Sequence, residues 1–279
     1  MNHEADIARL ADFVRRHARI FVLTGAGVST ESGIPDYRDA QGDWKRPEPV
    51  RFQDFMGSDA VRRRYWARSL IGWPVMVDAR PGPAHQALAQ LRAMGRVSQL
   101  LTQNVDGLHR AAGSGDDGLI ELHGRIDTVC CMACGQRTPR AGLQQRLLAL
   151  NPGWAALQAR AAPDGDADLD GLDFSGFDIP SCAQCGGILK PDVVFFGESV
   201  PPERVAAARA ALARSDAMLI VGSSLMVYSG FRFAQAAADA GLPLAALNMG
   251  RTRADALLSL KVQAPAGAAL TSLLERLQP

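Results

Sequence analysis

The sequence predicts an α/β protein: a Rossmann-like, doubly wound parallel sheet with a small inserted module of the zinc-ribbon type. Two observations predict this fold. Short apolar runs recur along the chain after helical patterns, and such alternation builds a parallel sheet with helices on both faces. In addition, four of the 5 cysteines fall into two pairs within a segment that interrupts the alternation.

The first elements form one unit of this alternation. Residues 4–18 carry Ile7, Leu10, Phe13 and Val14 at helical spacing and therefore predict an amphipathic helix. Residues 20–23 form a continuous apolar run, which is typical of a buried parallel strand. The run ends in a glycine turn at residues 25–29, and we expect residues 26–32 to open a helix.

The alternation continues along the chain, with further strands and helices predicted at 97–102, 218–221, 244–247, 84–94 and 203–214. Residues 34–50 are rich in proline and predict a long loop, and long loops are usually functional or mobile. These boundaries predict the following organisation: a Rossmann-like domain of residues 1–124 and 193–279, a zinc-binding module of residues 125–192, and a cofactor loop and helical segment formed by part of 34–70.

The composition limits the possible partners. Lys and Arg number 30 against 29 Asp and Glu among 279 residues, so bulk charge does not favour nucleic-acid binding. No apolar run approaches the roughly 18 residues that span a bilayer. The N-terminus lacks the pattern of a secretory signal. We therefore expect a cytoplasmic monomer without membrane or direct nucleic-acid partners, in which cysteines serve as metal ligands rather than disulfides.

The cysteine pairs predict one structural zinc ion. Cys131 and Cys134 form one C-x-x-C knuckle, and Cys182 and Cys185 form the other. Each spacing lets two thiolates meet one tetrahedral zinc, and four thiolates leave no position for water. The alternative, redox pairs or buried thiols, requires two such pairs to coincide. Cys130 stands outside both pairs, and we expect it to be a buried small hydrophobe.

A zinc ribbon could also bind nucleic acid. Arg125, Arg137 and Arg140 lie near the knuckles, but an acidic run from Asp164 to Asp178 offsets them. The local charge does not favour that function.

Polar residues follow the strand predicted at 97–102. Gln103, Asn104 and Asp106 lie at its carboxyl end, where open α/β sheets bind ligands, and they suit ribose hydroxyls and a carboxamide. The alternative is a turn in which Asp106 caps the next helix. The glycine turn at 25–29 is not a full G-x-G-x-x-G, so by itself it fits a plain turn as well as a pyrophosphate site. His123 alone favours a structural role.

Together these motifs resemble the sirtuin family of NAD-dependent protein deacylases. The matching segments follow the family's order: residues 25–29, 33–38, 102–109, 123–124, both cysteine pairs, 190–198, 222–224 and 248–250. Tyr37, residues 64–68, residues 138–140 and the long stretch between the cysteine pairs resemble the class II branch, which includes the mitochondrial sirtuin-4 type.

The resemblance implies NAD as cofactor, bound by four sets of residues. The phosphates and one ribose would be held by Gly25, Ala26, Gly27, Ser29, Gly222, Ser223 and Ser224. The adenosine end would contact Asn248, Met249, Gly250 and Ala266. In the mobile loop, Ile34 and Asp36 would bind the nicotinamide carboxamide and Tyr37 would shield the reacting sugar. Arg38 would help to order the loop. Gln103, Asn104 and Asp106 would position the ribose and nicotinamide.

The resemblance also implies the chemistry. The acyl oxygen would attack the ribose C1′ as nicotinamide leaves, and His123 would act as general base on a ribose hydroxyl before water releases O-acyl-ADP-ribose. A histidine near its ordinary pKa of about 6.5 suits this role.

Acyl-lysine proteins would bind as an extended strand between residues 193–198 and 227–230. Val194 would accept the acyl-lysine N–H through its carbonyl, beside Phe195, Gly197 and Glu198. Tyr65 and Arg68 lie three apart on a predicted helix and so share one face. Such a pair resembles the arrangement by which another sirtuin class grips acidic acyl chains, and the alternative is a packing pair.

Two rival activities stay open beside deacylation: mono-ADP-ribosylation of proteins, and a deacylase that prefers longer or dicarboxylic acyl groups over acetyl. A hydride-transferring dehydrogenase fits the glycine turn but neither the cysteine pairs nor residues 103–106.

Overall fold

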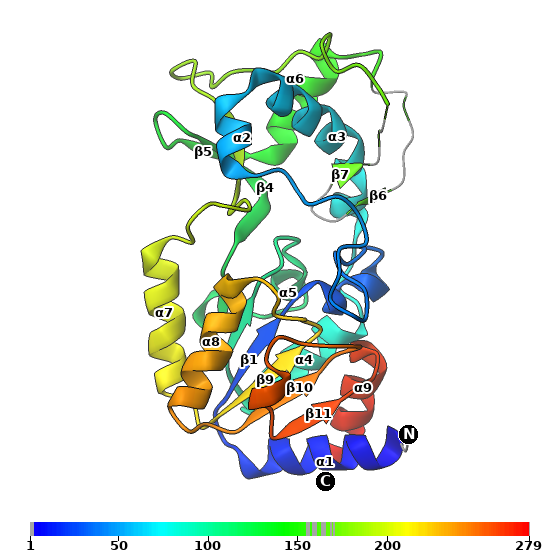
Figure 1. Ribbon diagram of the computed structural model, residues 1–279, viewed down its shortest axis with the longest axis vertical. Helices are drawn as coiled ribbons and strands as arrows, with labels where there is room; N and C mark the ends of the chain where they lie inside the picture. The colour runs from blue at the N-terminus through cyan, green and yellow to red at the C-terminus, as the bar shows by residue number, and fades with distance from the viewer. Residues whose placement is uncertain are drawn as a thin grey trace.

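The larger lobe is a six-stranded parallel sheet with helices on both faces (Figure 1). The structure is a computed structural model that describes residues 3–154, 157, 161–162, 166–167, 169 and 171–278. The strand order is β11-β10-β9-β1-β2-β3. The strands are β1 (Ile20–Thr24), β2 (Val97–Thr102), β3 (Leu119–Glu121), β9 (Ala217–Val221), β10 (Leu244–Leu247) and β11 (Leu260–Val262). This confirms the predicted Rossmann-like sheet.

Helices cover both faces of the sheet. One face packs against α1 (His3–Arg16), α4 (Pro83–Ala93) and α9 (Ala266–Leu277), and the other against α7 (Pro202–Ala213) and α8 (Tyr228–Asp239). Along β1, Ile20 and Val22 join the first core while Phe21 and Leu23 join the second. A strand buried on both faces needs apolar side chains at every position, which explains the continuous apolar runs.

The sheet has a topological switch point at β1. Its neighbours are β2 on one side and β9 on the other, so the chain direction around the sheet reverses there. Open α/β sheets bind ligands outside the carboxyl ends of the strands at this point. In this protein those ends are Thr24 and Val221, each followed by a glycine.

The smaller lobe combines the cysteine-bearing segment with two helices from earlier in the chain. Its three-stranded antiparallel sheet has the order β5 (Arg137–Pro139), β4 (Gly124–Cys131), β8 (Leu189–Val193). The strands and α6 (Arg140–Leu150) share one core with α2 (Phe52–Gly57) and α3 (Asp59–Asp78), in which Phe55, Trp66 and Phe177 are fully buried. The predicted helical segment thus runs past residue 70. Of the predicted acidic run, Asp164, Asp168 and Asp170 lie outside the described residues.

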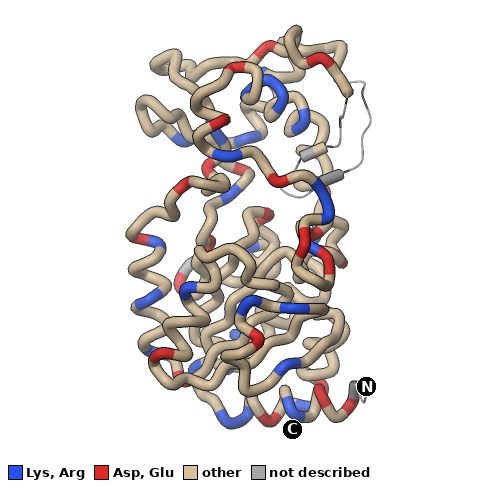
Figure 2. The backbone as a smooth tube through the Cα atoms, viewed as in Figure 1, with Lys and Arg blue, Asp and Glu red and all other residues tan. Residues whose placement is uncertain are grey.

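Short elements complete the fold. They are η1 (Ala26–Val28), η2 (Thr30–Ser32), α5 (Leu108–Ala111), η3 (Asp116–Gly118), β6 (Ala161–Ala162), β7 (Asp166–Ala167) and η5 (Asp255–Leu257). Residues 34–50 contain no helix or strand, as the prolines predict. No helix in the described part of the chain is long and apolar enough to cross a membrane. Basic and acidic residues are interspersed over both lobes (Figure 2).

Two local predictions were wrong. Residues 26–32 form two 3-10 turns instead of a helix, because Gly33 adopts a φ of 83° and Pro35 follows. Residues 227–230 are not extended, since Val227 caps α8 and the helix begins at Tyr228. The irregular stretch between β9 and α8 is residues 222–227.

Candidate active site

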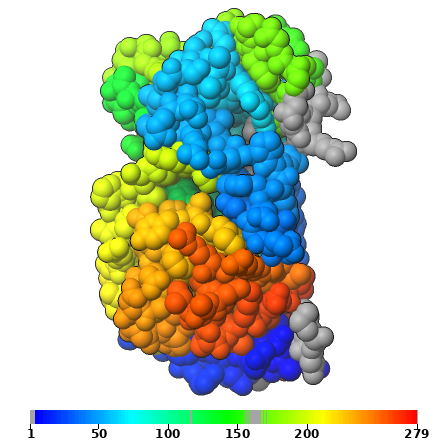
Figure 3. All heavy atoms as spheres, viewed as in Figure 1, coloured from blue at the N-terminus to red at the C-terminus, as the bar shows by residue number. Residues whose placement is uncertain are grey.

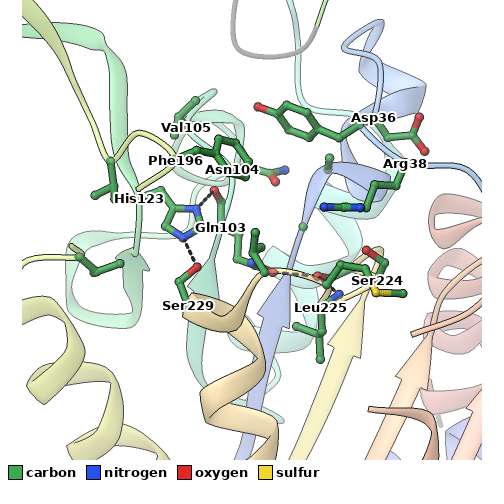
Figure 4. A pocket seen from close by; sticks show the side chains of 18 of the residues that line it. Asp36, Arg38, Gln103, Asn104, Val105, His123, Phe196, Ser224, Leu225 and Ser229 are labelled. Atoms are coloured by element: carbon green, nitrogen blue, oxygen red, sulfur yellow. Dashed lines mark hydrogen bonds between the residues drawn. The ribbon is translucent and has the colours of Figure 1, made fainter. Parts of the chain in front are cut away.

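A cavity of about 820 Å³ lies at the carboxyl ends of the sheet. Its lining comes from the turns after β1 and β9, the 34–50 loop, the polar segment after β2, and residues 193–200. Figure 3 shows the surface hollowed between the two lobes, beside the segment that carries α8. The fold therefore gathers the polar motifs of the sequence around one cavity, as Figure 4 shows from close by.

Two glycine turns meet at the switch point. The Gly27 N–H donates to the Gly222 carbonyl over 2.9 Å, and a Cβ on Gly27 would lie 2.9 Å from the Gly222 Cα. A Cβ on Gly222 would lie 2.7 Å from the Val28 nitrogen, at a φ of 59°. Only glycine permits this approach, so the two turns form one cradle of backbone groups.

The polar segment after β2 forms a hydrogen-bonded network with the first glycine turn. The Ser29 hydroxyl donates to Asp106 Oδ2 over 2.7 Å and accepts from Asn104 Nδ2 over 3.0 Å. Asp106 Oδ1 accepts the Leu108 N–H over 2.9 Å, so this carboxylate also binds the first amide of α5, whose N-cap residue is Gly107. Gln103 Oε1 accepts from the Ser223 hydroxyl over 2.7 Å and ties β2 to the turn after β9.

Two buried histidines support this network, and sequence reasoning missed them. The Gly82 N–H donates to His85 Nδ1, so Nε2 carries the proton and lies 3.3 Å from Ser29 Oγ. The His109 ring lies 4.7 Å from the His85 ring and its Nε2 is 2.9 Å from Thr24 Oγ1. Burial lowers the pKa of both histidines, so both are neutral at neutral pH. Only the tertiary fold brings them to Ser29.

His123 lies in the cavity wall with a defined tautomer (Figure 4). Its Nδ1 lies 2.8 Å from the Gln103 carbonyl, which can only accept, so Nδ1 carries the proton. The lone pair is then on Nε2, which lies 2.9 Å from the Ser229 hydroxyl. Desolvation lowers the pKa of His123 to about 4, the Gln103 carbonyl opposes this, and the charges of Arg232 and Arg204 add to it. The expected pKa near 6.5 was therefore wrong, because burial disfavours the imidazolium.

The neutral histidines make the fold sensitive to acid. Since the folded-state pKa values of His85, His109 and His123 lie below the unfolded value, their contribution to stability is complete above pH 6.5 and is lost as the pH falls toward the folded values, about 4 for His123. We expect the melting temperature to fall steeply between about pH 6.5 and 4. Thermal unfolding across this range measures it. The melting temperature of the His123→Asn variant should fall less steeply over this range. An identical slope for the variant and the parent would contradict a contribution of His123 to the acid sensitivity.

The 34–50 loop closes one side of the cavity. Ile34, Asp36, Tyr37 and Arg38, the loop residues that the resemblance assigns to NAD, all line it. The Arg38 guanidinium lies 3.7 Å from the Trp44 ring centroid and donates to the Gly42 carbonyl over 2.8 Å. Asp36 forms an ion pair with Lys45. Both charged side chains therefore hold the loop in shape in this structure.

Residues 193–198 form the opposite wall. The Val194 N–H donates to the His123 carbonyl over 2.8 Å, and its own carbonyl accepts no hydrogen bond from the described residues. Glu198 Oε2 accepts from Lys190 Nζ over 3.1 Å and from the Phe195 N–H over 2.8 Å. Glu198 thus fixes the wall rather than offering a free carboxylate. Gly197 also lines the cavity.

The structure places the remaining predicted residues at different distances from the cavity. Gly25, Ala26, Ser224, Asn248 and Met249 line it with the residues above, whereas Gly250 and Ala266 do not. The Gly250 backbone lies against Ala40 of the loop, and Ala266 begins α9.

Tyr65 and Arg68 also lie outside the cavity lining, on α3. The Tyr65 ring packs 5.3 Å from the rings of Phe55 and Phe195. The fold therefore does not bring this pair to His123. Instead, Met76, Ser229, Arg209 and Arg232 line the cavity, and sequence reasoning did not single out any of them.

The four paired cysteines form one cluster in the smaller lobe. Their sulfur atoms all lie within 4.8 Å of one another, with 3.5 Å between Cys131 and Cys185 and 3.9 Å between Cys134 and Cys182. Four thiolates around a tetrahedral zinc at about 2.3 Å would be roughly 3.8 Å apart. The residues fit a structural zinc.

Cys130 does not belong to this cluster. Its side chain is only partly buried, so the expectation of a buried hydrophobe was wrong. Alternation along β4 explains this, because Cys131 faces the core and Cys130 the opposite side.

A Rossmann-like sheet whose cavity opens at the switch point defines a dinucleotide-binding class of protein. Within that class the chain belongs to the Sir2 family, the sirtuins, whose family model it matches over residues 25–229. It is 64% identical over 264 residues to an "NAD-dependent protein deacetylase" of Xanthomonas campestris, covering 95% of this chain and 89% of that one. A protein of the same description from Bordetella bronchiseptica is 61% identical over 261 residues, covering 94% of each.

Solved structures agree with this assignment. A complex described as Sir2 with a p53 peptide and NAD+ superimposes with a TM-score of 0.78 at 26% identity, covering 97% of this chain and 98% of that one. A Sir2 enzyme structure concerned with mechanism and regulation gives 0.75 at 29% identity, covering 99% and 100%. The predicted resemblance to sirtuins is confirmed.

Proposed function

We propose that the protein is an NAD-dependent protein-lysine deacylase. The observation that carries the proposal is the neutral His123 imidazole beside the Gln103, Asn104 and Asp106 network, in one cavity at the switch point of the sheet. The NAD-dependent deacetylase relatives support it.

The cradle of glycine turns fits NAD. A Cβ on Gly25, Gly27 or Gly222 would collide with the opposite turn, so the two turns pack closely only as glycine. All three glycines line the cavity, where their backbone can approach a pyrophosphate. Ser29, Ser223, Ser224 and Asn248 supply side-chain contacts along the same edge. Bound NAD supplies an ADP-ribosyl acceptor for the acyl group and releases nicotinamide.

The protein's own groups then have distinct tasks. His123 takes a proton at Nε2, since its Nδ1 proton is fixed on the Gln103 carbonyl. An imidazole that is neutral at pH 7 is already in the form that a general base needs. Ser29 links Asn104 and Asp106 and so keeps their amide and carboxylate in place. The 34–50 loop lines the side of the cavity next to this network.

We propose that the substrate enters as an extended strand. The unused Val194 carbonyl is the acceptor for the acyl-lysine N–H, and residues 222–227 form the facing wall. Tyr37 and residues 64–68 support a place in the class II branch. The protein acts as a cytoplasmic monomer on proteins and has no direct nucleic-acid partner, consistent with its near-neutral charge.

Nicotinamide release tests the proposed function. The protein is incubated with NAD and either an acetyl-lysine peptide or the same peptide with free lysine. We expect nicotinamide release and loss of the acetyl mass only with the acetylated peptide. Equal nicotinamide release with both peptides, together with a gain in peptide mass, would instead establish mono-ADP-ribosylation. Formation of NADH would establish a dehydrogenase. Glutaryl-lysine and longer acyl-lysine peptides then define the acyl preference.

Gly27→Ala should weaken NAD binding by at least about tenfold, because the new Cβ would lie 2.9 Å from Gly222 and force the cradle open. Calorimetric titration with NAD measures the effect. Gly142→Ala is the matched control, since this glycine lies in α6 with nothing within 4 Å of the added Cβ. Unchanged NAD affinity in Gly27→Ala would contradict the cradle.

A further inference from the structure

The cavity extends past His123 into a region that the NAD cradle does not use. There it is lined by α7 and α8 rather than by the turns after the strands, with Pro202, Val205 and Arg209 from α7 and Tyr228, Ser229 and Arg232 from α8. Ser229 marks the boundary, since its hydroxyl lies 2.9 Å from His123 Nε2. This end of the cavity therefore begins at the proposed catalytic base and leads away from the cradle.

Two arginines line this end, and a third lies near His123. Arg209 and Arg232 line the cavity itself. Arg204 lies outside the cavity lining, with Nη1 only 3.1 Å from the position of a Cβ on Gly124, the residue after His123. The charges of Arg204 and Arg232 both reach the His123 ring, where they oppose its protonation. Together these three side chains form what we call the basic wall.

The basic wall has no carboxylate partner in the described part of the chain. Glu198, an acid that also lines the cavity, is occupied by Lys190 and the Phe195 N–H. Arg232 Nε is buried without an acceptor among the described residues. A cation enclosed in this way is more stable when an anion lies beside it, because a charge removed from water needs an opposite charge or hydrogen-bond acceptor.

Resting on the proposed function, we propose that the basic wall selects protein substrates that carry an aspartate or glutamate close to the acyl-lysine. An extended peptide held at Val194 has its lysine at His123, so its flanking residues leave the cavity past α7 and α8, the two helices that carry the arginines. Flanking side chains are two residues apart on one face of a strand and can reach this wall. A guanidinium matches a carboxylate in shape and in charge.

Matched peptides test the proposal. Two acetyl-lysine peptides are compared. The acidic peptide carries Asp and Glu beside the acyl-lysine, and the amide peptide carries their uncharged isosteres Asn and Gln at the same positions. We expect the acidic peptide to have about a three- to tenfold higher kcat/KM at low salt, mostly through a lower KM. The advantage should shrink as ionic strength rises. Equal kcat/KM values for the two peptides would overturn the proposal while leaving the deacylase function intact, whereas no turnover of either peptide would overturn the function.

Charge reversal locates the effect. In the Arg209→Glu variant the amide peptide should have the higher kcat/KM, because the new carboxylate repels the acidic peptide. Arg214→Glu is the control, since it makes the same charge change at the exposed end of the same helix and outside the cavity lining. Equal shifts in both variants would show long-range charge only and contradict the wall. A third peptide tests whether the arginines bind a carboxylate on the acyl chain instead. It carries glutaryl-lysine in the amide peptide. If this peptide has a higher kcat/KM than the acetylated amide peptide while flanking Asp and Glu give no advantage, the wall binds the acyl chain and the proposal is overturned.

Discussion

His123→Tyr is expected to lower kcat by at least about 100-fold while the protein remains folded. Tyrosine fills the space of the imidazole but cannot accept a proton at neutral pH, so the general base is lost. In the structure the ring is held by the Gln103 carbonyl at Nδ1, and the lone pair of Nε2 is the group that the variant removes. Steady-state rates with an acetyl-lysine peptide and saturating NAD measure the change.

His123→Asn is the companion variant. Its amide can still donate a hydrogen bond to the Gln103 carbonyl but offers no basic nitrogen. The variant therefore keeps the contact with the backbone and removes only the group that accepts a proton. We expect both variants to bind NAD and to melt near the temperature of the parent at pH 7.5. Near-normal kcat in His123→Asn would assign His123 a structural role.

Cys182→Ser is expected to unfold the smaller lobe, because it removes one of four zinc ligands. Zinc binding on the order of 10 kcal/mol would hold this lobe together, and much of that free energy is lost with the site. Circular dichroism and metal analysis of the purified variant measure the loss. Cys130→Ser is the control, since Cys130 neighbours Cys131 in the sequence but stands outside the cluster.

The larger lobe should respond differently. Its cores, on both faces of the six-stranded sheet, contain none of the four clustered cysteines. We expect a metal chelator to abolish activity and loosen the smaller lobe while protection of the β1 and β9 amides from hydrogen exchange persists. Full activity after complete removal of zinc would contradict a structural metal.

The sequence alone was sufficient for features encoded by local pattern. A short continuous apolar run such as 20–23 is typical of a strand buried on both faces, and the fold places it at the centre of the sheet. Cysteine spacing predicted the four ligands that the fold brings together. The glycines were recognised, but the reason for them, the contact between the turns at Gly27 and Gly222, depends on two strands far apart in the sequence.

Other features depend on packing that no local pattern encodes. His85 and His109 meet near Ser29 and Thr24 only because α4 packs against β2 and α5. The lowered pKa of His123 arises from its enclosure, which a sequence does not display. The arginines at 204, 209 and 232 resemble ordinary solvated helix residues until α7 and α8 are seen to frame the cavity.

The fate of the acyl group tests the central claim most directly. The protein is incubated with NAD and an acetyl-lysine peptide, and all products are followed by mass spectrometry. We predict equimolar nicotinamide, deacetylated peptide and ADP-ribose that carries the acetyl group. Free acetate with intact NAD, or a peptide that keeps its acetyl group and gains ADP-ribose, would contradict NAD-dependent deacylation.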